Sequence, residues 1–98
     1  MNVNGNEKYV LDLLYWLYRF SGDPKELASE GVILYRDELD EGLLPYYFDE
    51  IHSGEEVLVY FYSINEYVVY IITEAEEQEW LLVGILKRGE LVYNFVPD

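Results

Sequence analysis

The feature that most constrains the fold of this chain is a pair of apolar runs separated by a tight-turn signal. Val57–Ile64 and Tyr67–Thr73 are rich in β-branched and aromatic residues and flank the dipeptide Asn65-Glu66. Such runs on either side of two turn residues predict an antiparallel hairpin. In this register, both faces of the hairpin are apolar. Because an antiparallel sheet normally leaves one face to water, both faces here require a cover.

A second hairpin is predicted nearer the C-terminus. The runs Trp80–Leu86 and Leu91–Val96 flank a tight turn at Arg88-Gly89. A two-residue turn at this position places Gly84 opposite Tyr93. The tyrosine ring would then cover the space that the glycine leaves in the sheet.

The N-terminal segment Glu7–Phe20 predicts a helix. Asn6 precedes it as an N-cap, and Gly22 is the expected residue just beyond its C-terminus. Tyr15 and Trp16 lie off the apolar stripe of this helix, where a solvated face is usually polar. The stripe has the i, i+3, i+4, i+7 spacing of a buried helix face, and its members are Val10, Leu13, Leu14 and Leu17.

A second helix is predicted to begin at Asp23-Pro24-Lys25-Glu26. This run places a capping acid before a proline in the first turn and a glutamate three residues later. Gly31 would end the helix after about two turns. The next segment, Val32–Arg36, predicts a short strand, with a continued helix as the alternative. Leu43–Ile51 stays open between a short helix and an edge strand.

Together these segments predict one α+β domain over residues 1–98. Two N-terminal helices pack on a mostly antiparallel sheet of four to five strands, which contains the hairpins 57–73 and 80–96. Two helices cover only one face of such a sheet. We therefore expect the other face to be buried by a second copy of the chain, as in a homodimer, or by another partner.

The charge of the chain is large and unevenly distributed. Twenty acidic residues stand against six Lys and Arg, which gives a formal net charge of −14. Direct nucleic-acid binding is disfavoured, because it relies on Lys and Arg that neutralise phosphates. No Lys or Arg occurs between Asp37 and Leu86, where the acids fall mainly in predicted connections: Asp37, Glu38, Asp40, Glu41, Asp49, Glu50, Glu55, Glu56, Glu66, Glu74, Glu76, Glu77 and Glu79.

Two interpretations of this charge are open. The first is solubility, although a net charge of about 2–8 suffices for a small domain and self-repulsion costs stability. The second is docking on a basic protein surface, including mimicry of nucleic acid, because fourteen charges occupy about 24 Å of duplex. Exposed aromatic rings would add contact area at low entropic cost. The predicted binding residues are Asp37, Glu38, Asp40, Glu41, Asp49, Glu50, Glu74, Glu76, Glu77, Glu79, Tyr15 and Trp16.

Residue types that carry catalysis are missing or isolated. The chain has no cysteine, which excludes disulfides, zinc–cysteine sites and a cysteine nucleophile. His52 is the only histidine, and the nearby Asp49 and Ser53 do not make a triad, whose members come from separated segments. The carboxylate cluster at Asp37–Gly42 lacks the spacing of a calcium-binding EF-hand loop and a basic residue for hydrolysis.

We therefore predict a binding protein that is not an enzyme and uses no metal or cofactor. Its partner would be a basic protein surface, such as that of a nucleic-acid-binding protein. The alternative is a structural homo-oligomer in which charge serves only solubility. A metal-dependent hydrolase built on clustered carboxylates is the third possibility.

In composition the chain resembles small proteins of viruses that infect hyperthermophilic archaea, which are acidic, rich in tyrosine and free of cysteine. This chain has eleven tyrosines. The resemblance implies a single-domain protein of the host cytoplasm that is often dimeric and sometimes acts on host machinery. Independently, Met1–Asn6 lacks the basic start of a signal peptide, and no apolar run reaches the ~18 residues of a membrane span. We expect an intracellular protein with no membrane partner.

Overall fold

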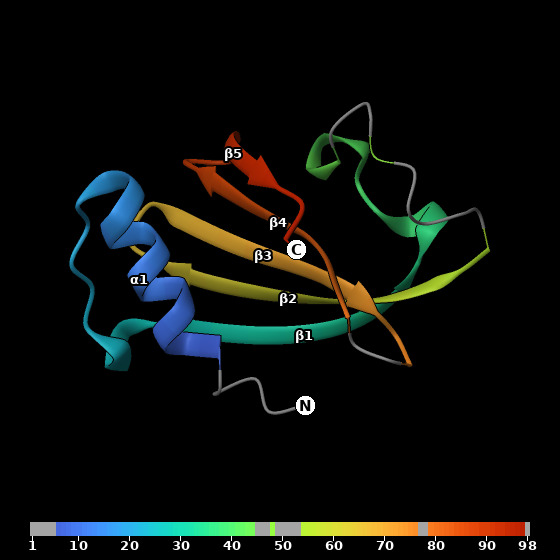
Figure 1. Cartoon of the computed structure of the whole chain (residues 1–98), viewed down its shortest axis with the longest axis horizontal. Helices are drawn as coiled ribbons and strands as arrows, with labels where there is room; N and C mark the ends of the chain where they lie inside the picture. Colours follow the sequence, from blue (N-terminus) through green and yellow to red (C-terminus); the bar gives the residue numbers. More distant parts are fainter. Residues whose placement is uncertain (1–5, 45–47, 49–53, 77–78, 98) are drawn as a thin grey trace.

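The computed structural model describes residues 6–44, 48, 54–76 and 79–97. Within them the chain forms one α-helix and five strands, which pair in chain order as one antiparallel sheet. The helix crosses one face of the sheet, and the connection after the first strand continues beyond the far end of the sheet (Figure 1). The elements are α1 (Glu7–Tyr18), β1 (Ala28–Tyr35), β2 (Glu56–Ile64), β3 (Tyr67–Glu74), β4 (Trp80–Lys87) and β5 (Glu90–Phe95), with the 3₁₀ turns η2 (Pro24–Glu26), η3 (Arg36–Glu38) and η4 (Glu41–Leu43).

Both predicted hairpins are confirmed. β2 and β3 pair up to Ile64 and Tyr67, so their connection is a two-residue turn. β4 and β5 pair up to Lys87 and Glu90. At this second turn Arg88 and Gly89 have φ values of 53° and 83°. Two central residues with positive φ match the right-handed twist of a hairpin, which explains a glycine at the second turn position.

The predicted partner of Gly84 is wrong by one residue. Gly84 lies opposite Asn94, because a β-bulge with Val92 as the extra residue shifts the register of β5. The ring that covers Gly84 comes instead from the neighbouring strand β3. It belongs to Tyr70, which pairs with Gly84 and occupies the space that a Cβ atom would need.

Helix α1 is confirmed, although it ends two residues earlier than predicted. Its C-cap is Arg19 in the left-handed conformation, not Gly22. Val10 and Leu14 of the apolar stripe are fully buried against the sheet, whereas Leu17 is 38% exposed. Leu17, in the last turn of α1, is therefore only partly covered by the sheet.

The second predicted helix is wrong. Asp23 does cap a turn, since its carboxylate accepts a hydrogen bond from the backbone N–H of Lys25 at 2.9 Å. That turn is only the three residues of η2, and β1 begins at Ala28. Gly31, the expected helix end, lies inside the strand and pairs with Tyr60. Pairing of all eight β1 residues with β2 outweighs the local helix-start signal, so the described fold is mainly β.

The sheet is apolar on both faces, as predicted, and the chain itself contributes to covering both. On the face that α1 covers, Val10 and Leu14 pack against the central strands. On the opposite face the cover is the connection after β1, through Leu39, Leu44 and Phe48. This removes the premise from which a second copy was expected, while the oligomeric state itself stays a prediction. Of the open segment 43–51, Leu43 ends η4, and residues 45–47 and 49–51 lie outside the described residues.

Candidate acidic docking site

The order of the strands brings the acidic connections to one end of the sheet. β1 and β3 finish at this end, and β2 and β4 begin there, because successive strands are antiparallel. The long connection from β1 to β2 and the connection from β3 to β4 therefore share one end (Figure 1). We call the carboxylates of these connections and of the adjoining strand ends the acidic end: Asp37, Glu38, Asp40, Glu41, Glu55, Glu56, Glu74, Glu76 and Glu79.

Most carboxylates of the acidic end are exposed. Glu74 is half-buried, and the other eight are open to solvent. The single base among them is Arg36, whose guanidinium contacts the carboxylate of Glu41 at 3.0 Å. In a five-stranded sheet the strands lie about 4.8 Å apart, so this end is roughly 19 Å wide. With Arg36 counted, the net charge of the acidic end is −8. Eight charges on duplex DNA occupy about 14 Å of its axis. The number of net charges at this end is therefore of the order that a similar length of nucleic-acid duplex carries.

Local hydrogen bonds order the first part of the acidic end. The carboxylate of Asp40 accepts from the backbone N–H of Gly42 at 2.8 Å and caps η4. The carboxylate of Glu38 accepts from the backbone N–H of Tyr35 at 2.9 Å. These contacts hold the backbone of the connection while leaving part of each carboxylate open to solvent.

A shallow groove of about 800 Å³ runs along the acidic end. Its polar wall consists of glutamates from two connections and from the strand ends next to them. Its apolar lining includes Ile33, which is 62% exposed. Glu55 and Glu56 belong to this wall but were not among the predicted binding residues. Their position at the start of a strand is a signal that the sequence does offer. The groove is lined by Ile33, Gly54, Glu55, Glu56, Val57, Glu74, Ala75, Glu76 and Leu81.

The opposite end of the sheet balances its charges. The carboxylate of Glu66, in the turn between β2 and β3, lies 2.8 Å from Nε of Arg88 and 3.8 Å from Nζ of Lys87. The molecule measures 38 Å along its longest axis. One end of the sheet is therefore strongly negative, while at the other end acids and bases meet.

The predicted aromatic binding residues lie apart from the acidic end. Tyr15 and Trp16 are on α1 and are 48% and 74% exposed. The C-terminal part of α1 approaches the β2–β3 turn, since Tyr18 stacks on Tyr67 with ring centroids 5.3 Å apart. Arg19 lies over the Tyr15 ring at 5.6 Å. The structure thus brings most of the described predicted acids together and leaves the two rings beside the balanced end.

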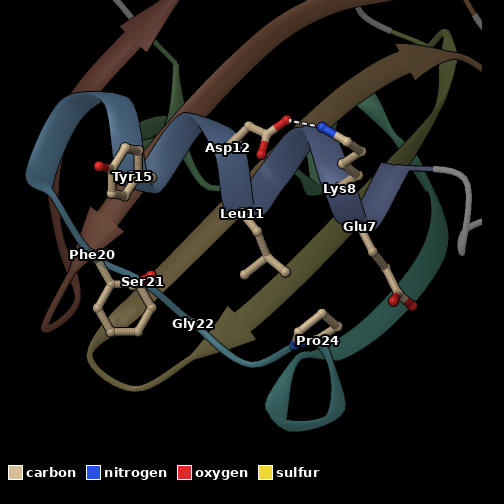
Figure 2. A pocket seen from close by; sticks show the side chains of 9 residues that line it. All are labelled: Glu7, Lys8, Leu11, Asp12, Tyr15, Phe20, Ser21, Gly22 and Pro24. Carbon is tan, nitrogen blue, oxygen red and sulfur yellow. Dashed lines mark hydrogen bonds and ion pairs between the residues drawn. The ribbon is translucent and has the colours of Figure 1, made fainter.

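A second hollow, of about 500 Å³, lies between α1 and the connection to η2. Figure 2 shows Leu11 directed toward this connection and Phe20 at one side of the hollow. The ion pair between Lys8 and Asp12, 2.6 Å long, stands on the helix above it. Its lining mixes apolar and charged side chains, and their arrangement does not indicate one class of ligand.

Four of the residues singled out from the sequence, Asp49, Glu50, His52 and Glu77, lie outside the described residues. Within the described part of the chain, no three acidic or histidine side chains gather closely enough to hold a metal ion.

No helix in the described ranges combines the length and the apolar character needed to cross a membrane. No protein-family model, curated protein or solved structure matches this chain.

Proposed function

We propose that this chain is an acidic docking protein that binds a basic surface of a partner protein through its acidic end. The observation that carries the proposal is the convergence of carboxylates from two separate connections on one end of the sheet. A nucleic-acid-binding protein is the partner class that fits, because its basic groove is built to receive charge at the density of a duplex.

The apolar lining of the groove supports docking over simple solubility. Charges that serve solubility need no common site, whereas here glutamates line the same groove as the exposed Ile33. Burial of apolar surface would hold a complex together, and the field of the acidic end would steer the encounter. Such binding weakens as salt screens the charges.

Binding of a fluorescent oligolysine peptide tests the acidic end. We expect anisotropy titrations to show affinity that falls at least tenfold between about 50 mM and about 200 mM salt. The double variant Glu56→Gln/Glu76→Gln should bind roughly five- to tenfold more weakly than the unchanged protein, because each exposed pair contributes up to about 1 kcal/mol.

The matched control is Glu26→Gln/Glu90→Gln, which removes the same charge outside the acidic end. Both control residues are exposed. We expect a much smaller loss of affinity for this variant. Equal losses for the two variants would mean that only net charge acts, and the proposal of a docking site would be wrong. A competition assay between this protein and a DNA duplex for a basic DNA-binding protein then tests the partner class.

A further inference from the structure

The two edges of the sheet are protected to different degrees. β5 has six residues and a β-bulge in its pairing with β4, and Pro97 follows it closely. β1 has eight residues that pair with β2 in one unbroken register, and it contains no proline or lysine. Bulges, prolines and lysines are the usual devices that stop an edge strand from accepting another strand. β1 lacks them, and Glu30 is its single charged residue.

The hydrogen bonds between β1 and β2 determine which backbone groups of β1 point away from the sheet. The N–H of Arg36 donates to the carbonyl of Glu55 at 2.7 Å, so these two residues form a hydrogen-bonded pair. Hydrogen-bonded and non-hydrogen-bonded pairs alternate along an antiparallel ladder. Ser29, Gly31 and Ile33, together with Tyr35, therefore direct their N–H and C=O groups outward.

One of these outward groups already has a partner. The N–H of Tyr35 donates to the carboxylate of Glu38 at 2.9 Å, which closes the edge at the end of β1. Ser29, Gly31 and Ile33 make no such contact with another described residue, and all three are exposed. The open part of the edge is thus a row of three residues, long enough to pair with a short extended segment.

The side chains around this edge differ on the two faces of the sheet. On the α1 face, Ile33 and Tyr35 are 62% and 51% exposed. On the other face, the exposed Glu30 lies on the side that the acidic connection after β1 covers. A strand added to β1 would place alternate side chains on these two faces. Apolar residues would suit the first face and basic residues the second.

We infer that β1 accepts an extended basic segment of the partner as a sixth strand of the sheet. The segment alternates apolar and basic residues and runs antiparallel to β1, like every pair already in the sheet. Its N-terminal part then lies nearest the acidic end. A second copy of this chain fits the edge less well, because two molecules of net charge −14 repel each other. The inference rests on the proposed function and adds the mode of binding.

The test uses the unchanged protein and the peptide Lys-Val-Lys-Val-Lys-Val-Lys. A matched peptide carries N-methyl groups on the alternate amides that face β1, which removes hydrogen-bond donors and keeps every charge and side chain. We expect the N-methylated peptide to bind at least about tenfold more weakly, because the main-chain ladder supplies affinity in strand addition. Ser29→Pro blocks an outward N–H of β1 and should reduce the difference between the two peptides.

The outcomes separate the two proposals. Equal affinity of the two peptides, lost in Glu56→Gln/Glu76→Gln, would retain the acidic docking site and overturn strand addition. Failure of both peptides to bind, while oligolysine binds, would overturn strand addition in the same way. Failure of oligolysine to bind would overturn the docking site itself. A dimer in sedimentation that Ser29→Pro dissociates would identify a second copy as the occupant and overturn the inference.

Discussion

The phenol hydroxyl of Tyr70 donates a hydrogen bond to the backbone carbonyl of Leu43, 2.5 Å away. Tyr70 belongs to β3 at the centre of the sheet, and Leu43 ends η4 in the acidic connection. This bond ties the cover of the second face to the strand beneath it. Through this bond a core side chain holds the backbone of the connection that follows β1.

Replacement of Tyr70 by phenylalanine should loosen this cover. Tyr70→Phe removes the donor and leaves the carbonyl of Leu43 without it, which costs roughly 1–3 kcal/mol of unfolding free energy. Denaturant unfolding measures the loss. Amide exchange should accelerate in 39–44 more than in β2, and uniform acceleration would contradict a local tie.

The buried tyrosine also makes stability depend on alkaline pH. Burial raises the pKa of Tyr70 from 10 to about 12. The folded protein therefore holds this proton where the unfolded chain has released it. The stabilisation is complete below pH 10 and is lost as the pH rises toward 12, by roughly 2–3 kcal/mol.

Unfolding free energies measured across this pH window test the assignment. Tyr70→Phe should show a shallower decline, although not a flat one, because burial also raises the pKa values of Tyr9, Tyr18 and Tyr62. The same slope in both proteins would contradict a dominant role of Tyr70.

Gly84→Ala should destabilise the sheet through the same ring. The added Cβ would overlap the phenol end of Tyr70, which has no free space to move into because it is fully buried. Overpacking of this kind costs about 1–3 kcal/mol. Gly31→Ala is the control within a strand, because its Cβ would stand 3.3 Å from the Tyr60 ring and β1 lies at the edge. A control loss as large as that of Gly84→Ala would argue against a steric cause.

Two variants of Glu38 distinguish its hydrogen bond to the N–H of Tyr35 from the effect of its negative charge. Glu38→Gln keeps a side-chain oxygen for the N–H of Tyr35, whereas Glu38→Ala removes it. We expect the alanine variant to lose about 0.5–1.5 kcal/mol and to show faster exchange of the Tyr35 amide. Similar exchange rates in the two variants would show that the hydrogen bond does not close the edge.

Trp16→Ala tests whether the exposed rings of α1 take part in binding. Trp16 is 74% exposed and lies on the helix whose last turn approaches the balanced end of the sheet. We expect oligolysine binding to stay unchanged and stability to shift by less than about 0.5 kcal/mol. A large loss of affinity would extend the docking site to this helix.

The hairpins were predictable because their signals are local. A turn dipeptide between two apolar runs specifies both the pairing and the register of β2 with β3. The bulge at Val92 carries no such signal, so the partner of Gly84 could not be derived from the turn alone. In this hairpin the tertiary packing of Tyr70 decides what covers the glycine.

The helix predicted to begin at Asp23–Glu26 was wrong because a local signal was used for a question that depends on distant residues. Capping signals describe how a helix starts, and they are satisfied here by a single turn. Whether a helix continues depends on what the following residues can pair with, and β2 offers a full-length partner to Ala28–Tyr35. The cover formed by Leu39, Leu44 and Phe48 was also beyond prediction, because an irregular segment has no periodicity to detect.

The acidic end itself was partly visible in the sequence. The sequence shows that 37–86 has no Lys or Arg and that its acids fall mainly between the predicted strands. Antiparallel pairing in chain order explains why the connections that carry these acids lie at the same end of the sheet. The separation of Tyr15 and Trp16 from the acids depends on how α1 crosses the sheet, which local patterns do not specify.

The chain-ordered sheet also has a kinetic consequence. β2 to β5 are joined by short connections and can pair one after another as neighbours, whereas β1 must close the connection over 36–55 before it reaches β2. Loop-closure entropy delays contacts of this range, so we expect β1 to join last. The edge that β1 meets during folding is the edge of β2. The final folding step is therefore itself an addition of a strand to an open sheet edge.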